Sequence, residues 1–102
     1  MEEGETLNAS HTEYPLYKAT LYGSKVSTAK LSKRVSCAIK ALPIRVIFHY
    51  EYDTLQALEK GVTKEPTMSL HNEILIEGLM QAEDITKVVE SYLTKDIIPL
   101  KQ

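Results

Sequence analysis

Two short apolar runs alternate with polar positions in a way that predicts a β-hairpin. They cover Thr67 to Leu70 and Glu73 to Glu77, and His71-Asn72 joins them. Asparagine accepts the positive φ of a tight turn, so the two runs are expected to pair in the antiparallel sense. Pro66 stands directly before the first strand, where its missing N–H removes no ladder hydrogen bond and a cis peptide is tolerated.

Two longer stretches place apolar residues every three or four positions, which predicts amphipathic helices. One stripe consists of Leu31, Val35, Ala38, Ile39 and Leu42, and the other, after Gly78, consists of Ile85, Val88, Val89, Tyr92 and Leu93. Ser27 or Thr28 can cap the first of these helices. Pro43 ends it, because the residue before a proline disfavours the α region.

The remaining elements are two strands and a short helix. Arg45 to Glu51 is almost continuously apolar, as expected of a central parallel strand. Lys18 to Tyr22 predicts an earlier, shorter strand. Asp53 can cap a short helix in which Leu55 and Leu58 are expected to face inward.

The order of these elements predicts an α/β domain. Two strands joined through a helix are expected to be parallel, and the later hairpin extends their sheet in the antiparallel sense. We therefore expect a four-stranded mixed sheet with helices on both faces, covering residues 14–96. Residues 1–13 have no apolar period and are expected to be disordered, and residues 97–102 form an apolar C-terminal tail.

Composition and charge exclude several classes of function. The chain has 102 residues and a formal net charge of -2, which gives no general attraction to nucleic acid or to an anionic membrane. Cys37 is the only cysteine, so an internal disulfide and a multi-thiolate zinc site are excluded. No apolar run approaches the roughly 20 residues of a membrane span, and the acidic amino terminus is unlike a signal peptide. We expect a cytoplasmic protein.

The layout resembles the thioredoxin fold, and most closely its short thioredoxin-like or glutaredoxin-like members, over Lys18 to Leu93. The resemblance rests on Gly23-Ser24 after the first strand, a helix starting there, Pro66 before a hairpin, and Gly78 before the last helix. It implies a Cys-x-x-Cys motif in the first βα loop, facing a cis-proline. Here either Lys25 and Thr28 or Ser24 and Ser27 occupy the two cysteine positions, and neither alignment supplies a thiol.

Without a thiol at the helix start, the usual chemistry of the fold is missing. Thiol-disulfide exchange needs a thiolate, and a helix N-terminus lowers a thiol pKa from about 8.5, whereas a hydroxyl stays protonated there. Cys37 lies well inside the helix and is expected to have no redox role. The three histidines lack the close spacing of metal ligands, so we expect no metal and no cofactor. A helix N-terminus with Lys25 beside it can still hold an anion.

Three functions stay open. The first is a redox-inactive binding module that takes a protein or peptide partner in a groove formed by Ser24, Lys25, Val26, Ser27, Thr28, Glu65, Pro66 and Thr67. The second is a structural subunit that assembles, with copies of itself or other chains, through the apolar tail. The third is a thiol-binding or anion-binding enzyme, for which no catalytic group is found. We favour the first, in which Lys25 and Glu65 either pair across the groove or are separately solvated.

Overall fold

The computed structural model describes residues 2–97, which form five strands and three helices around one sheet. The elements in chain order are β1 (Glu2–Leu7), β2 (Leu16–Tyr22), α1 (Lys25–Ile39), β3 (Arg45–Glu51), α2 (Thr54–Glu59), β4 (Thr67–Leu70), β5 (Glu73–Glu77) and α3 (Ala82–Ile97). The sheet order is β1-β3-β2-β4-β5. β2 and β3 are parallel, and every other neighbouring pair is antiparallel.

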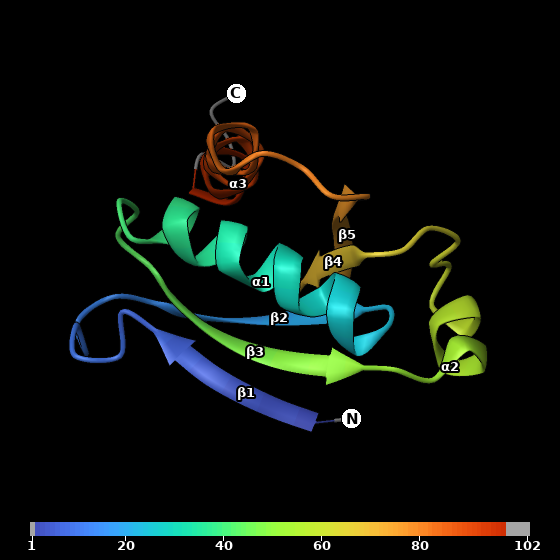
Figure 1. The fold of residues 1–102 in the computed structure, drawn as a ribbon. Helices are drawn as coiled ribbons and strands as arrows, with labels where there is room; N and C mark the ends of the chain where they lie inside the picture. The colour runs from blue at the N-terminus through green and yellow to red at the C-terminus, as the bar shows by residue number, and fades with distance from the viewer. Residues whose placement is uncertain (1, 98–102) are drawn as a thin grey trace.

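Helices α1 and α3 pack together on one face of the sheet (Figure 1). The main core lies between them and the strands, and its largest fully buried side chains are Phe48, Leu21, Leu31, Ile39, Ile44, Met68, Leu70, Ile76 and Ile85. The hairpin and the two predicted helical stripes are confirmed, except that α1 ends at Ile39 and not at Pro43, so Leu42 is buried in the turn after the helix. His71 and Asn72 both have positive φ angles, 49° and 70°, as a two-residue hairpin turn requires.

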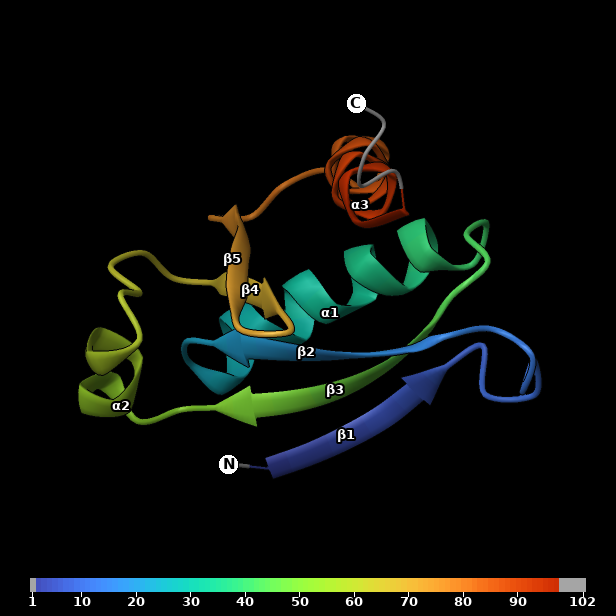
Figure 2. The ribbon, with the colours of Figure 1, turned by 180° about the vertical axis from the view of Figure 1, so that it is seen from behind.

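The other face of the sheet is covered at one end only. There Ala57 of α2 packs with Tyr22, Val62 and Ile74 in a small second cluster. The expectation of helices on both faces is therefore met only in part within residues 2–97: α1 and α3 cover one face, whereas the six-residue α2 lies beyond the end of β3 (Figure 2). The prediction that its leucines face inward is wrong, because this short helix contacts the sheet through Ala57.

The expected disorder of residues 1–13 and the expected count of four strands are also wrong. β1 pairs with β3 at the edge of the sheet, so backbone groups on its inner side are hydrogen-bonded although three of its six residues are glutamates. Gly4 lies so close to Phe48 and Tyr50 that a Cβ there would clash with them. Leu7 packs against the main core.

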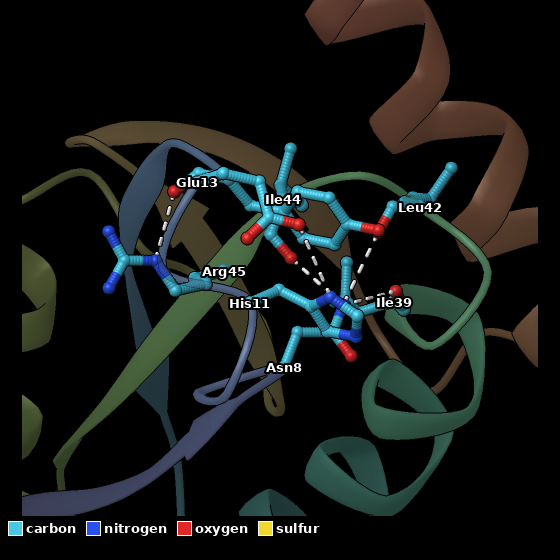
Figure 3. A network of polar contacts seen from close by, with 8 residues as sticks. Asn8, His11, Glu13, Ile39, Leu42, Ile44 and Arg45 are labelled. Atoms are coloured by element: carbon cyan, nitrogen blue, oxygen red, sulfur yellow. Dashed lines mark hydrogen bonds and ion pairs between the residues drawn. The ribbon is translucent and has the colours of Figure 1, made fainter.

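The side chain of Asn8, directly after this strand, links it to the end of α1 and to the turn that follows. The Asn8 amide donates hydrogen bonds to the carbonyl oxygens of Ile39, Leu42 and Ile44, at 3.1, 3.3 and 2.9 Å (Figure 3). Asn8 has φ +56°, a left-handed conformation that asparagine tolerates. β1 is thereby fixed by contacts more than thirty positions away in sequence.

The C-terminal boundaries also differ in part from expectation. α3 runs to Ile97. Most of the predicted apolar tail, residues 98–102, lies outside the described residues. Within the described range 2–97, no helix is long and apolar enough to cross a membrane.

Candidate functional site

The candidate site lies where β2 ends and α1 begins. Ser24, rather than the predicted Ser27 or Thr28, is the N-cap of α1, and its hydroxyl accepts a hydrogen bond from the backbone N–H of Ser27 at 3.1 Å. The two serine hydroxyls lie 3.1 Å apart. Thr28 turns inward and donates to the Ser24 carbonyl oxygen at 2.8 Å. Ser24 and Ser27 thus form a Ser-x-x-Ser pair at the helix start. Which of the two alignments with the Cys-x-x-Cys motif applies stays a prediction.

Glu65 comes to this helix end from the loop before β4. The Ser27 hydroxyl donates to its carboxylate at 3.1 Å. The Glu65-Pro66 peptide is cis. Gly23 makes the approach possible, because its φ is +145° and a Cβ on it would lie 2.7 Å from Ser27 Oγ and 2.9 Å from Glu65 Cγ. Only glycine allows the loop, the helix and Glu65 to meet so closely.

The negative charge of Glu65 is stabilised at the N-terminus of α1. Hydrogen bonds from the Ser24 hydroxyl, the Ser24 backbone and the Ser27 hydroxyl hold the pKa of Glu65 below its ordinary value of 4.5. A carboxylate at this position also interacts favourably with the helix dipole. The anion site predicted at the N-terminus of α1 is therefore occupied by a side chain of the same protein.

Lys25 does not pair with Glu65. The ion pairs of the described residues are His11–Glu13 and Lys95–Glu73. Instead, Lys25 Nζ lies 5.7 Å from the ring centre of Tyr52, within the range of a cation–π contact. Burial, followed by the hydrogen bond with Glu2, raises the pKa of Tyr52 above its ordinary value of 10.0.

A groove of about 310 Å³ lies beside this network. Its walls are three segments: the end of β2 with the first βα loop, the β3–α2 connection with α2, and the loop before Pro66. The lining residues are Tyr22, Gly23, Ser24, Glu51, Tyr52, Asp53, Thr54, Ala57, Leu58, Val62, Thr63, Lys64 and Glu65. The groove opens at the carboxyl ends of the parallel strands β2 and β3, where open α/β sheets bind ligands.

The predicted groove residues are not all in one place. Ser24 and Glu65 line the groove. Lys25 and Val26 instead line a separate hollow on the outer surface of α1. Ser27 contacts Glu65, while Thr28, Pro66 and Thr67 are buried and support the site from below.

The wall that sequence reasoning missed is formed by the β3–α2 connection. Tyr52, Asp53 and Leu58 line the groove there, although β3 and α2 were both predicted. The Asp53 carboxylate accepts the backbone N–H of Leu55 at 2.9 Å, so it caps α2 as expected. The signal that could have located this wall is the parallel pairing of β2 and β3, which brings their carboxyl ends to the same edge.

The other chemically interesting side chains lie elsewhere. Cys37 is exposed in the C-terminal half of α1, away from the groove. In the described part of the chain, no cluster of three or more histidine, cysteine, aspartate or glutamate side chains could hold a metal ion.

Comparison with known proteins gives a fold and no family. No protein-family model matches the sequence, and no curated protein matches it. The structure is similar to the crystal structure of thioredoxin from Aeropyrum pernix, with a TM-score of 0.53 and 11% sequence identity over 82% of this chain and 81% of that one. The chain has a thioredoxin-like fold. At this identity the similarity shows the fold alone.

Proposed function

We propose that this protein is a redox-inactive binding module that takes a protein or peptide partner in the groove beside the first βα loop. The observation that carries the proposal is the set of groups at the N-terminus of α1. Ser24 and Ser27 present hydroxyls, which do not ionise near neutral pH, so the site has no thiolate to attack a disulfide. Cys37 is exposed in the C-terminal half of α1, away from this helix end.

The position of Glu65 argues against an enzyme that binds a small anionic thiol. Its carboxylate accepts the Ser27 hydroxyl and is stabilised at the helix end, where such a ligand would otherwise place its own negative charge. An incoming anion would have to displace Glu65 and be repelled by it. A neutral or basic peptide meets no such obstacle.

The groove offers a partner both apolar contact and charge. Leu58 lines it and is 53% exposed, and neighbouring Leu55 is 70% exposed. The rim carries Glu51, Asp53 and Glu65 against one cation, Lys64. An apolar side chain of a partner would pack over the leucines, and the acidic rim would set its orientation and association rate.

Photo-crosslinking tests this proposal. With p-benzoylphenylalanine placed at Leu55, we expect the full-length protein to form one discrete adduct in extract of the source cells. Leu58→Glu should abolish that adduct because it places a charge in the apolar wall. Leu16→Glu is the matched control, since Leu16 is 47% exposed but begins β2 at the end of the strand far from the groove.

A second arm tests redox inactivity. We expect no insulin reduction by the purified protein with dithiothreitol as reductant beyond the rate of dithiothreitol alone. Turnover that Cys37→Ser abolishes would overturn the proposal in favour of an enzyme. An adduct that persists in the Leu58→Glu variant would show that the partner binds at another surface.

A further inference from the structure

The outer surface of α1 near its N-terminus carries a second hollow, separate from the groove. It has a volume of about 360 Å³ and is lined by Lys25, Val26, Ala29, Lys30 and Lys33. We call these residues the α1 basic surface. Val26 is 68% exposed, and Val26, Lys30 and Lys33 are spaced so that they share one helix face.

Neighbouring elements leave this surface open. In both views α3 lies over the C-terminal half of α1, and the N-terminal half extends beyond it (Figures 1 and 2). Ala29, Lys30 and Lys33 are all exposed. The apolar floor of the hollow is thus accessible between lysine side chains.

Lys25 also lines a hollow with Glu2, Glu51 and Asp53, but the charges of Lys30 and Lys33 are not neutralised by an ion pair within the described part of the chain. Helix α1 contains no acidic residue. The two ion pairs of residues 2–97 involve His11 with Glu13 and Lys95 with Glu73, so Lys30 and Lys33 have no ion-pair partner there. The whole chain nevertheless has a formal net charge of -2, so this surface is a local exception to the charge of the molecule.

Helix stability does not explain Lys25. A positive charge in the first turn of a helix opposes the helix dipole, and Lys25 is the first residue of α1. The first turn contains no acidic side chain to compensate, so the favourable charge is supplied by Glu65 from another loop. Lys25 is therefore a cation at a position where it does not help the helix.

We propose that the α1 basic surface is a docking site for an acidic protein segment that carries an apolar side chain. The apolar side chain would pack on Val26 and Ala29, and carboxylates on either side of it would meet Lys30 and Lys33. Charge complementarity and the size of the hollow favour this occupant. A nucleic acid or a membrane would need a broader basic surface than one short helix face provides.

The probe is a fluorescein-labelled amphipathic peptide with glutamates around a single leucine, compared with a twin in which glutamine replaces every glutamate. Fluorescence anisotropy with the full-length protein should show saturable binding of the acidic peptide only. The double variant Lys30→Glu with Lys33→Glu should weaken it by about tenfold or more, since two attractive contacts become repulsive. Amide shifts in an NMR titration should centre on residues 25–33.

The matched control is the double variant Lys60→Glu with Lys87→Glu, which makes the same change of net charge at two other exposed lysines. It should leave the affinity within about twofold of the unmodified protein. Leu58→Glu should also leave peptide binding unchanged, so failure of the groove proposal and failure of this one are distinguishable. Val26→Ser should weaken binding without a change in its salt dependence.

Four outcomes would overturn the proposal. The first is that the Lys60 and Lys87 control weakens binding of the acidic peptide as much as the Lys30 and Lys33 variant does, and the second is that the acidic peptide shows no saturable binding. The third and fourth are that the protein binds a single-stranded oligonucleotide, or phosphatidylserine vesicles, more tightly than it binds the acidic peptide. Sedimentation analysis supplies a fifth. Self-association that the Lys30 and Lys33 variant abolishes would assign the surface to a second copy of this chain.

Discussion

Replacing Asn8 tests how the N-terminal strand is held in the fold. Its two amide protons serve three carbonyl oxygens, of which Ile44 O is the nearest at 2.9 Å. The carbonyls of Ile39 and Leu42 also accept backbone N–H groups from Leu42 and Ile44, so they keep a partner when the amide is removed. Each net hydrogen bond contributes roughly 0.5–1.5 kcal/mol, so the loss should be about 1–2 kcal/mol of the free energy of unfolding.

Three variants at this position separate the amide from the backbone. Asn8→Gly keeps the positive φ at no steric cost and should show the loss of the amide alone. Asn8→Ala adds the strain of a left-handed conformation, about 1–2 kcal/mol more. Asn8→Asp accepts this φ but points a carboxylate at the three carbonyl oxygens, so it should be less stable than Asn8→Gly at neutral pH.

The aspartate variant has its own pH signature. Carbonyl oxygens disfavour the charged form, so the pKa of the introduced carboxyl is raised in the folded state above its unfolded value. The stability that protonation restores is then complete below the unfolded pKa and is lost as pH rises through the folded pKa. Asn8→Gly has no group that titrates there and should lack this dependence.

Urea unfolding followed by far-ultraviolet circular dichroism measures these differences. Asn72→Gly is the matched control, because Asn72 also has a positive φ but makes no side-chain hydrogen bond among those found for the described residues. It should change the free energy of unfolding by less than about 0.5 kcal/mol. A loss that small for Asn8→Gly, or a flat pH response of Asn8→Asp, would refute the role given to the Asn8 amide.

The candidate site supports three further predictions. Gly23→Ala should destabilise the fold by about 1–3 kcal/mol in urea unfolding, more than Gly61→Ala, which has φ +85° but no atom within 4 Å of the added Cβ. Because the folded pKa of Glu65 is lowered, its contribution is present above its unfolded pKa, near 4.5, and lost as pH falls through the folded value. In the Glu65→Gln variant, the free energy of unfolding should therefore fall less steeply as pH decreases below about 4.5. A pH profile identical to that of the unmodified protein would contradict the hydrogen bonds described. Installing Ser24→Cys together with Ser27→Cys should create a dithiol that oxidises to a disulfide, measured by thiol titration as a fall from three free thiols to one, that of Cys37. Three thiols that persist under oxidation would contradict the matching of these positions to the Cys-x-x-Cys motif.

Local sequence determined much of the fold. The stripe of Leu31 and Val35 identified α1, and that of Ile85 and Val89 identified α3, because a repeat of three to four residues is a property of the helix itself. The hairpin followed from the positive φ that Asn72 tolerates. These elements were predictable because the residues that define each one are neighbours in the chain.

The candidate site was predictable only in part. Ser24 and Glu65 were located because the resemblance placed a loop and a proline opposite each other, and the structure brings both to the groove. The orientation of Leu55 and Leu58 was not predictable. The spacing of two leucines does not say whether a six-residue helix lies over a sheet or beyond its end, and here the smaller Ala57 makes the contact.

Strand β1 shows what only the tertiary structure decided. Its sequence is acidic and has no apolar period, so the side-chain pattern does not predict a strand. The strand forms because its hydrogen bonds to β3 involve backbone groups, which every sequence has. Its position depends on Gly4, which fits against Tyr50, and on Asn8, which reaches carbonyl oxygens at the end of α1. In the sequence alone, Gly4 and Asn8 are typical of a loop. Their roles depend on residues far away in the chain, which only the tertiary structure brings next to them.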